Sequence, residues 1–193
     1  MVKVQMAHAI FFGVVPEACT FLFGSRGPMA HRRELAILLL AAAPVLAQGS
    51  RGKAELKAGS SSITIDYGRP SSPTDRVGEQ QVGEVWRMGK DAATVIKTPV
   101  DLMFGATRIA AGSYSLFLAR PASDRYELVF NSQTGQWGTA HDPSKDVARV
   151  PLRRETLPNL VETFTIELKG AGKGGSFVMS WGKTRLSADF TTK

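Results

Sequence analysis

Ser62-Ile63-Thr64-Ile65-Asp66-Tyr67 carries an apolar side chain at every second position and a polar one between. Successive side chains of a β-strand point to opposite faces, so this alternation predicts a strand with one buried face. The same period of two returns in residues 125–130, 163–168 and 177–181. Residues 114–119 are apolar on both faces apart from serines, which is typical of a central strand covered on both sides.

Shorter apolar runs add candidate strands at residues 94–98, 102–104, 147–150 and 185–190. Turn residues separate these runs, and the spacing favours about nine short strands. We find no helical stripe, although residues 82–90 are compatible with a single helical turn around Trp86. The sequence therefore predicts an all-β domain, an antiparallel β-sandwich that is jelly-roll-like or a distorted barrel.

The N-terminal region carries the features of a secretory signal peptide. Arg32 and Arg33 precede an apolar run from Leu35 to Ala47, which ends in the small-residue pattern of a cleavage site. We expect residues 29–47 to be the signal peptide and residues 1–28 to be a mis-assigned upstream extension; a longer hydrophobic leader that stays in the membrane is the alternative. The domain prediction continues with a flexible leader at 48–60 and one domain at 61–193. The expected location is periplasmic or extracellular, with no integral membrane segment after cleavage.

Composition narrows the function classes. The chain has 24 Lys and Arg against 17 Asp and Glu, a formal net charge of +7, and its one cysteine is Cys19, before the expected cleavage site. The basic residues are scattered and aromatic residues do not interleave with them, so we expect no nucleic-acid partner. The charge is compatible with an anionic envelope component, although a solvated basic surface is the simpler explanation and is favoured.

Five sequence motifs resemble, in order and spacing, one bacterial family catalogued as domain of unknown function 2911. They are Gly83-Glu-Val-Trp-Arg-Met-Gly89, Gly112-Ser-Tyr-Ser-Leu-Phe117, Phe130-Asn-Ser-Gln-Thr-Gly-Gln-Trp-Gly138, an opening Tyr67-Gly-Arg-Pro-Ser71 and a late Phe164-Thr-Ile-Glu167. The resemblance spans roughly residues 60–190. It implies no activity, because the family is defined by a sequence pattern.

Trp86 and Arg87 form the first candidate binding site. An indole beside a guanidinium offers an apolar platform and a planar donor fork suited to carboxylate or phosphate. The structural alternative is that Trp86 plugs the open end of the sandwich while Arg87 pairs with a buried acid, Glu84 or Asp91.

A second candidate cluster consists of Asn131, Gln133, Gln136 and Trp137. Such residues bind a sugar by stacking and by amide hydrogen bonds. The structural alternative is a wide hairpin with a packed Trp137.

His141, Asp142 and Asp146 are a third candidate, because a base and two acids lie close together in the sequence. A metal site built from one loop lacks the usual ligand spacing, and Asp-Pro commonly opens a turn, so we expect no metal. Relatives in the resembled family often carry an aromatic residue in place of His141, which weakens histidine chemistry further.

Other catalytic signatures are absent from the sequence after residue 47. Gly170-Ala-Gly-Lys-Gly-Gly175 matches a dinucleotide fingerprint by letter, but the strand-like Phe177–Trp181 follows it where a helix is required. These glycines therefore predict a hairpin and no cofactor. No Gly-x-Ser-x-Gly elbow occurs, and nothing selects a glycosidase pair among the acids.

Together these features favour an exported, non-catalytic module that binds an unknown ligand, either a glycan or an anionic envelope component. A hydrolase of envelope or carbohydrate material that uses Arg87, His141 and Asp142 is the alternative. A structural scaffold that pairs through exposed strand edges is a further alternative. The sequence leaves the oligomeric state and catalytic status open.

Overall fold

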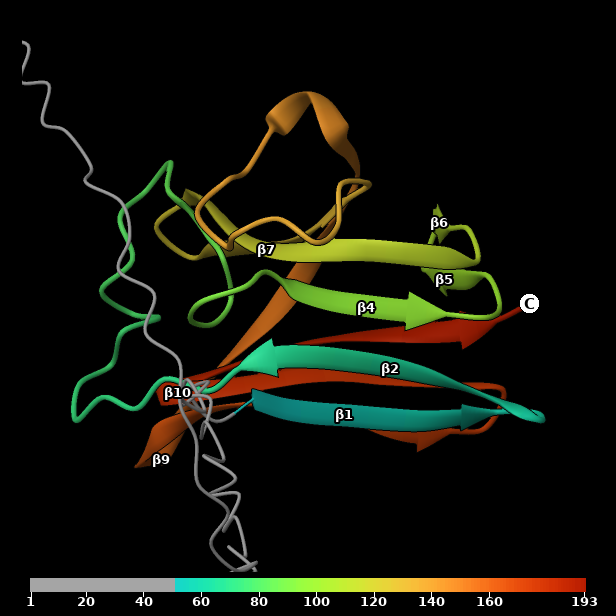
Figure 1. Ribbon diagram of the computed structural model, residues 1–193. Coiled ribbons are helices and arrows are strands. Elements are labelled where there is room, and N and C mark those ends of the chain that lie inside the picture. Colours follow the sequence, from blue (N-terminus) through green and yellow to red (C-terminus); the bar gives the residue numbers. More distant parts are fainter. Residues whose placement is uncertain (1–50) are drawn as a thin grey trace, which may run out of the picture. The chain divides into compact units, whose positions relative to one another are not determined.

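A computed structural model describes residues 51–193 of the chain (Figure 1). The predicted signal peptide at 29–47, the upstream residues 1–28 and residues 48–50 lie outside this part. Within it, no helix is long and apolar enough to cross a membrane.

The described residues form ten β-strands and one short 3-10 helix, η1 (Pro143–Lys145). The strands are β1 (Arg51–Ala58), β2 (Ser61–Gly68), β3 (Val85–Trp86), β4 (Thr94–Thr98), β5 (Leu102–Phe104), β6 (Thr107–Ile109), β7 (Gly112–Ala122), β8 (Arg125–Asn131), β9 (Asp146–Ala171) and β10 (Gly174–Thr192). Hydrogen bonds join them in the order β1-β2-β4-β7-β8-β9-β10-β5-β6, with β3 also pairing with β7. Every pair is antiparallel, which confirms the predicted all-β sandwich class.

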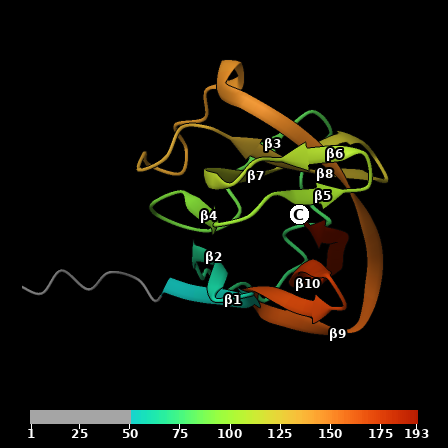
Figure 2. The same cartoon turned by 90° about the vertical axis from the view of Figure 1, so that its right-hand side faces the viewer.

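Two long strands give the sheet its sandwich shape. The first part of β9 pairs with β8, and its later part pairs with β10. Figure 2 shows β9 curving from the layer that contains β7 and β8 to the layer that contains β10. The register of β10 shifts around Gly182, where the backbone has a φ of 66° and forms a bulge. Bulges of this kind bend a strand and increase its twist.

The core lies between these layers and follows the alternation seen in the sequence. Ile63 and Ile65 in β2 are fully buried, as are Phe164 in β9 and Phe177 in β10. The Tyr67 hydroxyl crosses the core and donates a hydrogen bond to the carbonyl of Ile166 at 3.3 Å. Side chains at alternating strand positions therefore fill one continuous apolar cluster, which is the main source of stability for a domain without disulfides.

The prediction of a flexible leader at 48–60 is wrong for most of its length. Residues 51–58 form β1, which pairs with β2 in unbroken register from Arg51–Gly68 to Ala58–Ser61. Ala54, Leu56 and Ala58 of this strand contact the core, and only Leu56 is large, so hydrogen bonding to β2 rather than a row of large apolar residues defines the strand. The domain accordingly includes residues before its predicted start at Ser61.

Two smaller predictions also need correction. Residues 82–90 contain β3 and not a helical turn, because Val85 and Trp86 pair with Ala119 and Leu118 of β7. Residues 107–109, which show too short a pattern to detect, form β6. The predicted hairpin in the glycine-rich segment is confirmed, since β9 and β10 are joined there through Gly172, whose φ of 54° suits a tight turn.

Candidate functional site

The loop from Ser71 to Glu84, which we call the pocket loop, crosses one end of the sandwich and is fixed at several points. Ser71 forms an isolated β-bridge with Thr163, and the Ser72 amide donates to the carbonyl of Glu162 at 2.9 Å. In the middle of the loop Val77 is buried. These contacts give the loop a defined position against β9.

Asp75 anchors the pocket loop to the bulge in β10. The Thr184 hydroxyl donates to one Asp75 carboxylate oxygen at 3.3 Å, and the Gly78 amide donates to the other at 3.3 Å. The Asp75 backbone lies so close to Gly182 that a Cβ atom at residue 182 would be 2.4 Å from the Asp75 Cα. Glycine therefore serves two purposes at residue 182: it adopts the left-handed conformation and leaves room for the loop.

Two polar side chains hold the far end of the pocket loop. Gln80 is 7% exposed, and its Nε2 donates to the carbonyls of Glu84 and Leu118, both at 3.0 Å. Arg120 donates through Nη1 to the carbonyls of Gly78 and Gln80. A buried amide and a guanidinium thus satisfy backbone carbonyls that a loop would otherwise leave to solvent.

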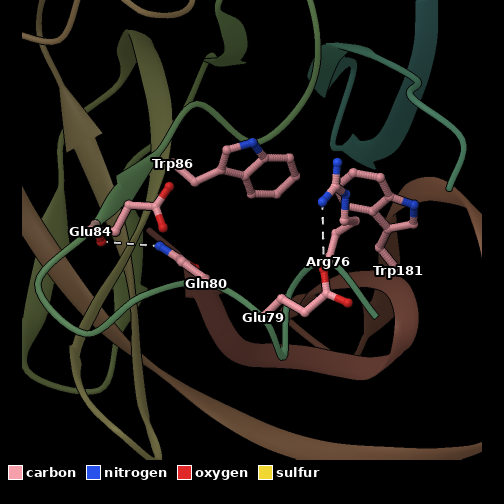
Figure 3. Close-up of a pocket in the computed structure, with 6 residues that line it drawn as sticks. All are labelled: Arg76, Glu79, Gln80, Glu84, Trp86 and Trp181. Carbon is pink, nitrogen blue, oxygen red and sulfur yellow. Dashed lines mark hydrogen bonds and ion pairs between the residues drawn. The ribbon is translucent and has the colours of Figure 1, made fainter. Parts of the chain in front are cut away.

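The pocket loop, β3 and β10 border a half-open cavity of about 270 Å³, which we call the tryptophan pocket (Figure 3). The indoles of Trp86 and Trp181 lie 5.4 Å apart with an interplanar angle of 22°, a stacked arrangement. Phe164 packs edge-on against both, with ring centroids 5.2 Å from Trp86 and 5.9 Å from Trp181. Trp181 Nε1 donates to the carbonyl of Glu162 at 2.9 Å, which fixes its orientation. The aromatic wall is therefore held in place by packing and by a hydrogen bond.

The remaining wall of the tryptophan pocket is polar. Figure 3 shows Glu84 and Gln80 on one side, Arg76 and Trp181 on the other, and Glu79 between them. Arg76 pairs with Glu79 at 3.5 Å. Glu84 accepts a hydrogen bond from the Gln81 amide at 3.0 Å but forms no ion pair within residues 51–193.

Trp86 and Arg87 do not form the joint platform that we predicted. Trp86 lines the tryptophan pocket, whereas Arg87 lies against Gly138, where a Cβ atom would be only 2.7 Å from the Arg87 Cδ. Arg87 Nε donates to the carbonyl of Gly89 at 3.1 Å, and among the described residues no acid pairs with it. The alternative in which Arg87 pairs with Glu84 or Asp91 is therefore wrong as well.

Most of the second predicted cluster holds the loop at 132–145, which we call the outer loop, over β7 and β8. Asn131 is fully buried, and its Nδ2 donates to the Asp142 carbonyl at 2.8 Å and to Asp146 at 2.9 Å. Gln136 Nε2 donates to the Ser115 hydroxyl at 3.1 Å. These amides face the protein, so they stabilise the loop in the structure as it stands.

Trp137 differs from its neighbours because its side chain is 57% exposed. Its backbone is fixed by a β-bridge to Ala92, and the adjacent Gly138 amide donates to the Asp91 carbonyl at 3.0 Å. The packed tryptophan that we considered as an alternative is therefore wrong at residue 137. Trp137 precedes Gly138 in the chain, and the Arg87 side chain lies against Gly138, so the two residues are close to each other. We call Trp137 and Arg87 the corner surface.

His141 and Asp146 form a sheltered pair. His141 Nε2 lies 2.8 Å from an Asp146 carboxylate oxygen, and its ring centroid lies 4.4 Å from that of Phe117. Burial alone would raise the pKa of Asp146, but hydrogen bonds from Asn131, His141 and Arg149 outweigh it and hold the pKa below its ordinary value. The pair closes the outer loop over the face of β7.

Asp142 points away from this pair and caps η1. One carboxylate oxygen accepts from the Ser144 hydroxyl at 2.7 Å and from the Ser144 amide at 3.0 Å, and these bonds lower the pKa of Asp142. Asp142 thus has the turn-opening role that Asp-Pro suggested. In residues 51–193 no three or more His, Cys, Asp or Glu side chains are grouped closely enough to hold a metal ion.

Comparison with known protein families shows which family the domain belongs to. A family model described as "Protein of unknown function (DUF2911)" matches residues 50–190. The chain belongs to this family. The match confirms the resemblance noted from the five motifs, and it begins about ten residues earlier than those motifs suggested, so the DUF2911 domain includes β1. No curated protein and no solved structure matched the chain.

Of the residues that line the tryptophan pocket in this DUF2911 domain, sequence reasoning singled out only Trp86 as part of a site. It missed Arg76, Glu79, Gln80 and Trp181, and treated Glu84 only as a partner for Arg87. The available signal was length: the segment between the predicted strands at 62–67 and 94–98 is longer than most strand connections, and such long loops are often functional.

Proposed function

We propose that this DUF2911 domain is an exported, non-catalytic module that binds a small organic ligand in the tryptophan pocket. The observation that carries the proposal is the stacked pair Trp86 and Trp181, which borders a cavity of about 270 Å³. Ligand sites combine an apolar or aromatic wall with a few fixed polar groups, and this pocket has both. Its size is close to the lower end of typical ligand pockets, which favours a ligand of about one sugar ring.

The proposed location in the periplasm or outside the cell rests on the sequence. Residues 29–47 have the charge, the apolar run and the small residues of a signal peptide. No cysteine follows Cys19, which suits a domain that is stabilised by its core and does not depend on disulfides.

Binding is favoured over hydrolysis by the placement of the candidate catalytic groups. His141 is occupied by Asp146 and packs against Phe117, while Asp142 caps η1. None of these groups lines the tryptophan pocket. The hydrolase considered from the sequence would need these groups beside its bound substrate.

A ligand screen with two tryptophan variants tests the proposal. Thermal unfolding of the full chain is measured with sugars, amino acids, amines, nucleotides and divalent cations, since a ligand at 100 times its Kd adds about 2.7 kcal/mol to stability. The expected result is a dose-dependent rise in Tm that is lost in Trp86→Ala. Trp137→Ala is the matched control, because Trp137 is exposed and lies outside the pocket, and it should retain the rise. Equal loss in both variants, or a rise unchanged in Trp86→Ala, contradicts the proposed site.

The corner surface is a second candidate, for the anionic envelope component suggested by the sequence. It is favoured by the absence of any acid paired with Arg87 among residues 51–193 and by the exposed indole of Trp137. Arg87 presents a planar fork that suits carboxylate or phosphate groups. Co-sedimentation with vesicles that contain anionic phospholipid should be weakened in Arg87→Ala and unchanged in Trp86→Ala. The reverse pattern would exclude the corner surface as the binding site.

A further inference from the structure

We propose that the tryptophan pocket selects an organic ammonium ion, that is, a small amine or quaternary ammonium compound. This proposal rests on the proposed function and names the chemical class of its ligand. It is argued from the charge of the pocket and from its aromatic wall.

The charge of the pocket is opposite to that of the whole chain. The chain carries a net charge of +7, yet two carboxylates and one guanidinium line the cavity, from Glu79, Glu84 and Arg76. Arg76 pairs with Glu79 at 3.5 Å, which leaves Glu84 without a cationic partner among the described residues. A cleft with an excess of one sign concentrates ligands of the other sign, so the pocket favours cations over anions.

The aromatic wall suits a cation. Tryptophan is the side chain that attracts an ammonium most strongly through the face of its ring. Trp86 is only half-buried, and it lines the cavity together with Trp181, on which it stacks. Phe164 packs edge-on against both indoles. An aromatic wall next to a carboxylate suits an ammonium group, because the face of the ring contacts the ion and its apolar substituents while the carboxylate pairs with its positive charge.

Gln80 keeps Glu84 at the edge of the pocket. Its side chain is 7% exposed and forms part of the pocket wall, and Nε2 donates to the carbonyls of Glu84 and Leu118, both at 3.0 Å. The unpaired carboxylate is therefore carried by a segment whose backbone is held in place.

The test uses three probes built on one sugar ring that differ in charge. Glucosamine carries an ammonium group, N-acetylglucosamine is neutral and glucuronate carries a carboxylate. Binding to the full chain is measured by isothermal titration calorimetry at low salt, where charge effects are largest. We expect glucosamine to bind at least tenfold more tightly than the other two. Putrescine and choline distinguish the source of the ammonium: tighter binding of either identifies a non-sugar amine, and weaker binding of both identifies an amino sugar.

Two variants locate the effect in the pocket. Glu84→Gln removes the unpaired carboxylate and should weaken binding of the preferred cation by about fivefold, the size expected for one partly exposed charge pair. Glu79→Gln frees Arg76 and should weaken it as well. Glu167→Gln is the matched control, because this exposed acid in β9 pairs with Lys169 at 3.4 Å and does not line the pocket, and it should leave binding unchanged. Urea unfolding of each variant checks that it is folded.

The outcomes separate this inference from the proposed function. If N-acetylglucosamine or glucuronate binds as tightly as glucosamine and Trp86→Ala abolishes that binding, the ammonium assignment is wrong and the binding module stands. If every ammonium probe fails to bind while another small ligand binds in a Trp86-dependent way, the ammonium assignment is again wrong and the proposed binding module stands. If no ligand of any class depends on Trp86, both proposals fall.

Discussion

The bulge at Gly182 is the joint between the core and the tryptophan pocket, so replacing it tests how the pocket loop is positioned. A Cβ atom at residue 182 would lie 2.4 Å from the Asp75 Cα, which is backbone and cannot rotate away. Gly182→Ala must therefore displace the pocket loop. Gly172→Ala is a matched control: Gly172 has a similar φ, 54° against 66°, but no atom lies within 4 Å of the added Cβ.

The expected costs follow from these two environments. A left-handed conformation costs an alanine about 1 kcal/mol, and both variants incur this cost. In Gly182→Ala, displacement of Asp75 also weakens its hydrogen bonds with Thr184 and Gly78, each about 1 kcal/mol. We expect the free energy of unfolding to fall by about 3 kcal/mol in Gly182→Ala and by about 1 kcal/mol in Gly172→Ala.

Urea unfolding followed by far-UV circular dichroism measures both values. With a denaturant slope of about 2 kcal/mol/M, the two midpoints should differ by about 1 M. Near-UV circular dichroism should also change only in Gly182→Ala, because Trp181 precedes the bulge and stacks on Trp86. Equal destabilisation of the two variants would show that displacing the pocket loop does not lower the free energy of unfolding. It would refute the view that the bulge fixes the position of the pocket loop.

Three further predictions concern the core, the outer loop and export. Phe164→Ala removes the ring beneath both pocket tryptophans and should lower the free energy of unfolding by about 3–5 kcal/mol in urea titrations; a loss below 1 kcal/mol would contradict its role. The pKa of Asp146 is lowered in the folded state, so its stabilising effect is fully present above about pH 4, the ordinary pKa of an aspartate, and is lost as the pH falls from there through the lower pKa of the folded state. Asp146→Asn should therefore be less stable than the parent at pH 7, with the difference shrinking below about pH 4; a constant difference across pH would exclude the linkage. Intact mass of the exported protein should place its N-terminus at Gln48, and retention of Met1 would contradict the proposed start and cleavage sites.

The fold was largely predictable because strand burial in this domain follows a period of two. Ile63, Ile65 and Phe164 occupy the buried positions that the alternation assigned to them. The errors occurred where side-chain pattern does not determine the strand. β1 is held by backbone pairing with β2, and β3 is two residues long, so neither has enough apolar positions to show a period.

The site was less predictable, because its parts come together only in the folded chain. Trp86 and Trp181 are 95 positions apart in the numbering and stack at 5.4 Å because β3 and β10 reach the same end of the sandwich. Sequence reasoning grouped Trp86 with Arg87 on the basis of adjacency, but adjacent residues of an extended chain face opposite ways. Trp86 therefore faces Trp181 while Arg87 reaches Gly138. The same geometry separates the two proposed sites, which are adjacent in the sequence: a pocket with an excess of carboxylate, proposed for a cation, and a surface with an unpaired guanidinium, proposed for an anion. A ligand that carries both charges would have to reach two separate places, so the variants Trp86→Ala and Arg87→Ala should affect different ligands.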